Sequence, residues 1–346
     1  MQKMGTFINA CTNGPCQQNY ASIVSMYFFV ASIIFIILKV SFIYVVGAPL
    51  FLGGGRLAAF SEGWGVLFFF EKATVPVITI IAITNILQKN TRLLKIICGL
   101  LLIFIVLSAI ANGSRSVFLT ILFGYYYAEK YIESIEKRAR VISNKFIVLL
   151  YILTIIFFIF VNVIQWNFSI EEAVLSFFER LFAQGDVYCY FYIGDYFDTD
   201  IAGNLSSDFI IPLMAKFRLF DYSKVIPQLG IRMVSYEMGL ESASGPNNRI
   251  NVLSLAAFGL FGAVIFSYCV GWFVAWVRNN SLKFGCESEL LTIFVYAYAS
   301  QVIFFAEQDF YAMLNFIIMS SLINSVLLLG VFIVKYLMTT GDFASN

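Results

Sequence analysis

Arginine is unevenly distributed among the loops that separate the apolar segments of this chain. Six of the ten arginines fall in alternate loops: Arg56, Arg115, Arg180, Arg218, Arg232 and Arg249. A guanidinium group binds phosphate or carboxylate through two parallel hydrogen bonds, whereas a lysine ammonium acts as a point charge. Arginines drawn from three separate loops therefore predict a site for a phosphate-bearing or carboxylate-bearing ligand. In the alternative interpretation, each arginine pairs with an acidic residue of the longest of these loops, namely Glu179, Asp186, Asp221, Glu237 or Glu241.

The stretch Gly-Pro-Asn-Asn-Arg-Ile-Asn, residues 245–251, ends a polar segment of more than eighty residues and leads directly into the apolar run 252–277. This junction predicts that Asn248, Arg249 and Asn251 lie at the mouth of a membrane helix and contact a substrate there. One arginine in such a place is weak evidence by itself, because arginines at helix ends often extend to the membrane surface.

Acid–base chemistry in this protein has to use carboxylates, because the chain contains no histidine. The candidates are Asp186, Glu241, Glu62, Glu307 and Asp309. Asp186 is the first choice because it follows Arg180 closely. Glu307 and Asp309 lie in a short turn and could equally pair with Arg115 or Arg249. The six cysteines are interpreted as structural, and neither a metal site nor a cofactor is predicted.

Composition indicates a membrane protein. Hydrophobic residues make up 60% of the chain, charged residues 12%, and the mean hydropathy is +0.84, whereas soluble domains carry roughly 25% charged residues. Apolar segments of membrane length predict an all-α bundle of about eight spans. We place them at 21–46, 64–87, 93–111, 116–131, 146–164, 252–277, 290–305 and 310–337. The first two contain Lys39 and Glu71–Lys72, so either could be a broken helix or a re-entrant segment.

Every second loop is rich in Lys and Arg, which predicts that those loops and both termini are cytoplasmic. The chain then has three parts: N-terminal helices (1–164), a large outer loop (165–251) and C-terminal helices (252–346). The polar first nineteen residues do not resemble a signal peptide.

Within the large loop, Ser169 and Glu172 have the spacing of a capping box at the start of a helix. Apolar residues follow at helical spacing: Ile170, Val174, Phe177, Phe178 and Leu181. We expect this amphipathic helix to lie on the outer leaflet and to bring Arg180 to the lipid headgroups. The aromatic run 188–197 suits either sugar faces or the membrane interface.

Three short motifs follow one another along the chain. Gly-Ser-Arg-Ser (113–116) lies between two spans, Arg180 to Asp186 forms Arg-x4-Gly-Asp in the large loop, and Asn-Asn-Arg-x-Asn (247–251) leads into Phe-Gly-Leu-Phe-Gly (258–262). This order resembles that of the Wzy-type O-antigen or oligosaccharide repeat-unit polymerases. The likeness covers roughly residues 100 to 280. Members of that family usually have ten or more spans, which is more than the eight predicted here.

The resemblance implies a metal-independent glycosyltransferase of the GT-C-like type at the periplasmic face of a bacterial inner membrane. Such an enzyme transfers a glycan from a polyprenyl diphosphate to the next lipid-linked repeat unit, with arginines holding the diphosphate and a carboxylate acting as base. Its partners would be the lipid-linked oligosaccharide, membrane lipids and a chain-length regulator, and no nucleic acid.

Three alternatives remain open at this point. A flippase for the same lipid-linked oligosaccharide would carry charge within several spans. An O-antigen ligase would be expected to have a histidine in its outer loop, and this chain has none. A sugar or ion transporter would show internal repeats and broken helices with charge near the middle of the membrane.

Overall fold

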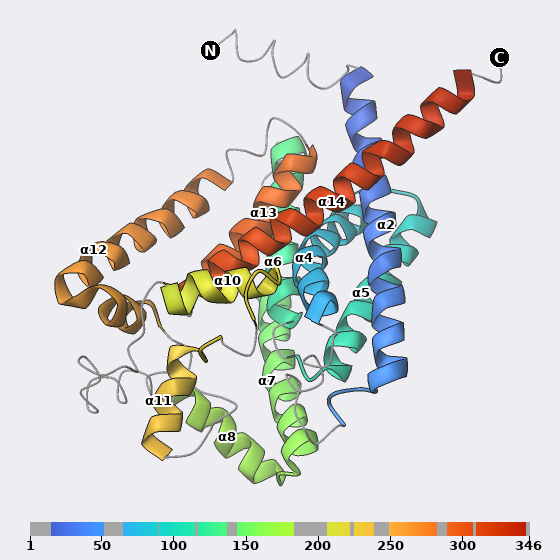
Figure 1. Cartoon of the computed structure of the whole chain (residues 1–346). Helices are drawn as coiled ribbons and strands as arrows, with labels where there is room; N and C mark the ends of the chain where they lie inside the picture. The colour runs from blue at the N-terminus through green and yellow to red at the C-terminus, as the bar shows by residue number, and fades with distance from the viewer. Residues whose placement is uncertain are drawn as a thin grey trace. The chain divides into compact units, whose positions relative to one another are not determined.

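The computed structural model describes residues 15–51, 65–88, 90–114, 117–136, 144–182, 206–221, 225–238, 249–281, 289–306 and 309–343. Every regular element in these ranges is a helix (Figure 1), so the all-α prediction is confirmed for this part of the chain. The chain divides into two compact units. The first comprises Met1–Asn167, Ser281–Tyr298 and Met319–Asn346, and the second comprises Phe168–Asn280 and Ala299–Ile318.

All eight predicted spans are helical. The helices are α2 (Pro15–Val46), α4 (Gly65–Leu87), α5 (Arg92–Ala111), α6 (Val117–Glu136), α7 (Asn144–Trp166), α12 (Ile250–Ser281), α13 (Glu289–Phe305) and α14 (Phe310–Phe343). Six of them, all except α6 and α13, contain a stretch long and apolar enough to cross a membrane. The length and apolar composition of these helices indicate a membrane protein. The count of eight crossings stays a prediction.

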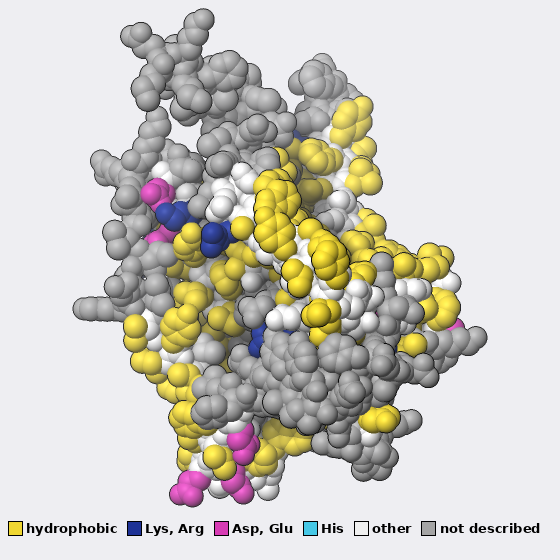
Figure 2. Space-filling model, turned by 90° about the vertical axis from the view of Figure 1, so that its left-hand side faces the viewer, with side chains coloured by type: hydrophobic (Ala, Val, Ile, Leu, Met, Phe, Trp, Pro, Cys, Tyr) yellow, Lys and Arg dark blue, Asp and Glu magenta, His cyan; other side chains and the backbone are white. Residues whose placement is uncertain are grey.

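Helix α4 lies at the centre of the first unit. Its apolar stretch is 78% buried within the protein, compared with 28% for the stretches of α2 and α5. It packs against α2, α5 and α6. The outer helices leave large apolar side chains such as Leu100 and Ile103 exposed, as expected of surfaces that face lipid. Figure 2 shows hydrophobic side chains spread over one face of the molecule.

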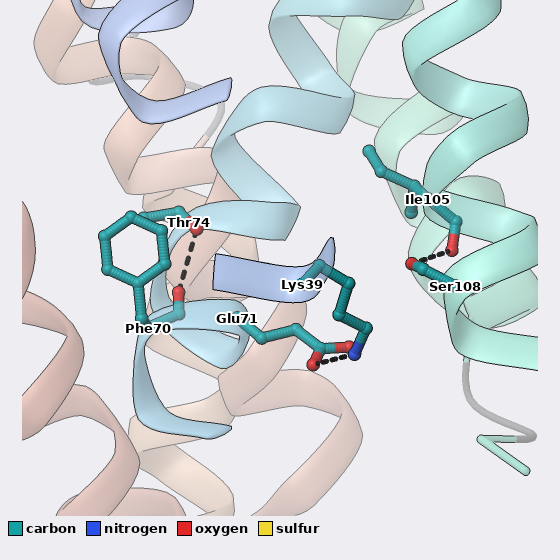
Figure 3. Close-up of polar contacts among 6 residues, drawn as sticks. All are labelled: Lys39, Phe70, Glu71, Thr74, Ile105 and Ser108. Atoms are coloured by element: carbon teal, nitrogen blue, oxygen red, sulfur yellow. Dashed lines mark hydrogen bonds and ion pairs between the residues drawn. The ribbon is translucent and has the colours of Figure 1, made fainter. Parts of the chain in front are cut away.

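The charged residues in the first two predicted spans do not break them, because α2 and α4 are continuous helices. The Lys39 ammonium on α2 instead donates to Glu71 Oε2 on α4 at 2.7 Å (Figure 3), and the Lys39 side chain is fully buried. Hydroxyl groups on these and neighbouring helices bond to their own backbone, as Thr74 does to the Phe70 carbonyl and Ser108 to that of Ile105 (Figure 3).

A second polar connection in the first unit centres on Asn324 of α14. Its Oδ1 accepts from the Tyr27 hydroxyl at 2.6 Å, and its Nδ2 donates to the Tyr298 hydroxyl and to the Ala73 carbonyl. One amide thus connects α2, α4, α13 and α14. Such hydrogen bonds between membrane helices each contribute roughly 0.6 kcal/mol on average.

The interrupted helix is α12. Gly259 has φ 66° and ψ −179°, a backbone conformation that only glycine adopts readily. Ser254 Oγ and Ser267 Oγ lie 3.3 Å apart although thirteen residues separate them, whereas an unbroken helix would hold them about 20 Å apart. Residues 250–258 therefore fold back against residues 260–281, and the ribbon of α12 reverses its direction in Figure 1. The prediction of one continuous span at 252–277 is wrong for this reason.

Close packing of α4 on α6 depends on Gly124. A Cβ added at this position would lie 2.6 Å from Thr79 Cγ2, whereas a Cβ at Gly99 of α5 would meet nothing within 4 Å. We expect Gly124→Ala to destabilise the protein by about 1–3 kcal/mol through overpacking. Gly99→Ala should be neutral or stabilising by up to about 1 kcal/mol, because alanine favours the helix. Unfolding of both variants in detergent checks this, and equal effects would contradict the packing argument.

Candidate functional site

The segment that connects α7 to α12 forms four described helical elements: α8 (Ile170–Phe182), η3 (Ser206–Ile210), α10 (Ile211–Lys216) and α11 (Leu229–Met238). The capping box of α8 is confirmed. Glu172 Oε2 accepts from the Ser169 backbone N–H at 2.7 Å, and Ser169 Oγ accepts from that of Glu172 at 3.2 Å. These hydrogen bonds hold the pKa of Glu172 below its usual value. Apolar Ile170 and Phe178 are exposed, and their contact with the outer leaflet stays a prediction.

Four charged side chains of the second unit, Asp208, Lys216, Arg232 and Asp309, interact with one another, and we call them the ionic cluster. Arg232 Nη2 lies 2.9 Å from Asp208 Oδ1, and the two side chains are only 10% and 7% exposed. Asp309 is close enough for its charge to act on Asp208 and on Lys216. Two cations and two carboxylates are thus held together in a largely buried place.

An apolar core fixes the elements that carry the ionic cluster. The ring of Phe209, next to Asp208, lies 5.6 Å from the ring of Tyr311. From α11, Leu229 and Met233 are fully buried in the same core, together with Val252 and Leu253 of α12. Arg232 lies on the same helix, and its guanidinium reaches Asp208 of η3.

Asp309 caps the N-terminus of α14. Its Oδ1 accepts from the Ala312 backbone N–H at 2.9 Å, and the Tyr311 N–H also bonds to the carboxylate. A carboxylate in this position satisfies backbone donors that have no partner within the helix. Asp309 is therefore held in place by its own helix while its charge acts on Lys216.

Burial governs the electrostatics of the ionic cluster. It raises the pKa of Asp208 to about 6, although the Arg232 guanidinium acts in the opposite direction. Burial also raises the pKa of Asp309, although the backbone hydrogen bonds to its carboxylate act to lower it. Burial lowers the pKa of Lys216. A carboxyl group that exchanges its proton near neutral pH is suited to act as a general base.

The Tyr311 hydroxyl completes this region. Tyr311 is 3% exposed, and within the described residues its Oη makes no hydrogen bond. Its hydroxyl is close enough to interact with both Asp208 and Asp309. A buried hydroxyl in such surroundings can donate to an oxygen of a bound ligand.

The structure places five of the predicted site residues, and one of them, Asp309, is the member of the ionic cluster that caps α14. Arg232 belongs to the ionic cluster and pairs with Asp208. For this arginine the alternative interpretation, pairing with an acidic residue of the large loop, is confirmed, although Asp208 was not among the expected partners. Arg218 is exposed in the turn after α10 and has φ 57°. Arg249 is half-buried immediately before α12 and has φ 42°. Asn251 is exposed in the first turn of α12.

The other predicted residues are not covered by the structural description. Outside the described residues lie Arg56, Glu62, Arg115, Asp186, Glu241, Asn248 and Glu307. Arg180 belongs to α8, but its side chain is outside the description as well. Their roles stay predictions.

Sequence reasoning missed Asp208, Lys216 and Tyr311. No motif marks them, and Asp208 is separated along the chain from both Arg232 and Asp309. The one available signal was that Asp309 stands directly before an apolar run, where an N-cap is expected. Among the described residues, no group of three or more Cys, Asp and Glu is arranged to hold a metal ion.

Comparison of the chain with protein-family models, with curated proteins and with solved structures gives no match. The membrane helices and the ionic cluster are therefore the features that bear on function.

The raised pKa of Asp208 predicts how stability depends on pH. Between the ordinary value of 3.8 and about 6, the folded protein binds more protons at this site than the unfolded chain does. The contribution of Asp208 to the free energy of unfolding should therefore rise as the pH is lowered from 7 to 4. Thermal unfolding in detergent should show a weaker pH dependence for Asp208→Asn, while exposed Asp221→Asn serves as the control. Identical pH profiles for the wild type and Asp208→Asn would contradict this.

Proposed function

We propose that this protein is a glycosyltransferase of the Wzy polymerase type, which joins polyprenyl-diphosphate-linked oligosaccharide repeat units into O-antigen or a related surface polysaccharide. The observation that carries the proposal is the ionic cluster. It combines a carboxyl group whose pKa is raised to about 6, a guanidinium and an ammonium, within a unit that also contains an apolar helix of membrane length. Transfer of a glycan from a lipid-linked diphosphate uses a base for the acceptor hydroxyl and cationic groups for the leaving diphosphate, and the ionic cluster contains both kinds of group.

In the proposed reaction, an acceptor hydroxyl attacks the first sugar carbon of the donor glycan. The bond from the acceptor oxygen to that carbon forms, and the bond from the carbon to the diphosphate oxygen breaks. The diphosphate leaves with the electron pair, and cationic side chains stabilise its charge. The hydroxyl proton passes to a carboxylate. Asp208 is the described carboxylate best suited to accept it, and Asp186 and Glu241 remain candidates.

The proposal places the enzyme in a bacterial inner membrane with eight crossings and both termini in the cytoplasm. The segment between α7 and α12 then lies on the periplasmic side, where lipid-linked repeats are joined. The alternation of basic and arginine-containing loops supports this orientation. A chain-length regulator would be a partner there.

A lipid-linked oligosaccharide flippase, or another polytopic transporter, is the second candidate. It is favoured by the Lys39–Glu71 ion pair, since charged groups inside membrane helices often mark a transport pathway. The two candidates differ in whether a glycosidic bond is made.

Substitution of Arg249 tests the proposed contact with diphosphate. Arg249→Lys should shorten the polysaccharide ladder nearly as much as Arg249→Ala, because an ammonium cannot form the two-pronged contact. Arg278→Lys, a change at the opposite end of α12, should leave the ladder unchanged. The ladder is read on gels of lipopolysaccharide from complemented cells. A normal ladder with Arg249→Lys would show that a positive charge alone suffices at this position, and it would remove the two-pronged contact of Arg249 with diphosphate from the proposal.

A further inference from the structure

We propose that α12 is a helical hairpin whose second arm crosses the membrane, whose apolar tip contacts membrane lipid and whose first residues lie near the middle of the bilayer. The inference depends on the break at Gly259 and on the packing of the second unit, and it does not rest on the proposed enzymatic activity.

The second arm of the hairpin is long enough to cross the membrane. Residues 260–277 contain no charged side chain, and as a helix they extend about 27 Å, close to the roughly 30 Å hydrocarbon thickness of a bilayer. Large apolar side chains project outward along this arm: Leu260 is 78% exposed, Phe261 82% and Val264 66%, and Trp272 is also exposed. Lipid is the partner that fits an uncharged surface of this length.

The first arm runs antiparallel to the second. Ser254 lies against Ser267, and the ring centroids of Phe258 and Phe266 are 5.1 Å apart. Ile250 packs into one apolar cluster with Val270. Because Val270 is ten residues beyond Leu260, the start of the first arm lies about 15 Å from the hairpin tip along the second arm.

A hairpin that enters and leaves through the same membrane face does not fit these lengths. The first arm has nine residues and the second has twenty-two, so the second arm would extend about 20 Å beyond that face. Its exposed Trp272 and Trp276 would then stand in water. A second arm that crosses the bilayer keeps these side chains in lipid or at its interface.

This geometry sets the depth of charged residues. Arg249 directly precedes Ile250, and Ala306 from the turn before α14 belongs to the same apolar cluster as Ile250. Arg249 and the turn that carries Asp309 therefore lie well inside the thickness of the bilayer. Charged side chains at such depth are costly and usually functional. The ionic cluster of the second unit therefore lies below the membrane surface, and the hairpin lies between this cluster and the lipid.

Depth-dependent fluorescence quenching tests the hairpin. The full-length protein is placed in phosphatidylcholine vesicles, with one fluorophore on native Cys269 or on Phe261→Cys at the tip, and with the other cysteines replaced by alanine. Lipids brominated close to the headgroup should quench the label at 261 most, and lipids brominated deep in the chain should quench the label at 269 most. Leu260→Cys provides a second tip position. The opposite order would place the tip deepest and overturn the proposal.

A disulfide tests the fold-back independently of the lipid. Ser254→Cys combined with Ser267→Cys should form an intramolecular disulfide on mild oxidation, seen as loss of maleimide–polyethylene glycol labelling. The pair Ser254→Cys and Cys269 is the control for background labelling. Failure of the 254–267 pair to cross-link in folded protein would mean that the two arms are not adjacent, and would also overturn the proposal.

Discussion

Replacement of Asp208 by asparagine is expected to reduce the rate of glycan transfer by about a hundredfold to ten-thousandfold, the usual loss when a general base is removed. The amide keeps the shape of the side chain but cannot accept the hydroxyl proton. Cells that carry Asp208→Asn should produce lipopolysaccharide capped with a single repeat unit and no ladder.

Two controls separate catalysis from folding. Asp208→Asn also leaves Arg232 without its 2.9 Å carboxylate partner, so protein amount and melting temperature have to be measured alongside the ladder. Exposed Asp221→Asn should leave the ladder normal. The same assay on Asp186→Asn ranks the two carboxylates. A normal ladder with Asp208→Asn and no ladder with Asp186→Asn would assign the base to Asp186 instead.

The second large effect concerns stability. Lys39→Met should destabilise the protein by about 3–5 kcal/mol, because it leaves the Glu71 carboxylate without its partner in an interior where Lys39 itself is fully buried. The double variant Lys39→Met/Glu71→Met should recover most of the loss, since replacing both charges removes the unpaired one. Unfolding in detergent measures both.

A matched control is available on α6. Lys130 and Glu133 form an ion pair with side chains 35% and 32% exposed, and Lys130→Met should cost only about 0–1 kcal/mol. Equal losses for Lys39→Met and Lys130→Met would contradict the argument from burial. A double variant at 39 and 71 that folds normally but is inactive would favour the transport alternative.

Residue types and spacing were sufficient to predict the helices. Apolar runs of membrane length located all eight helices, and the Ser169–Glu172 spacing located the start of α8, because both signals are local in the chain. The Lys39–Glu71 pair shows the limit of this reasoning. A lone charge in an apolar run suggests a break, whereas two charges on neighbouring helices neutralise each other and leave both helices intact.

The break in α12 and the ionic cluster could not be predicted in the same way. Glycine is common in membrane helices, so nothing local distinguishes Gly259, which breaks α12, from Gly271, which does not. Asp208, Arg232 and Asp309 come from segments far apart in the chain, and only the apolar core around Tyr311 brings them together. Chain spacing carries no information about such contacts.

The most direct test of the proposed function uses the purified protein in vesicles with a synthetic polyprenyl-diphosphate-linked oligosaccharide as the only substrate. Mass spectrometry of the lipid fraction should detect products with two or more repeat units together with free polyprenyl diphosphate, and both should be lost with Asp208→Asn. Substrate that stays at one repeat unit but moves between the two leaflets would contradict a polymerase and identify a flippase.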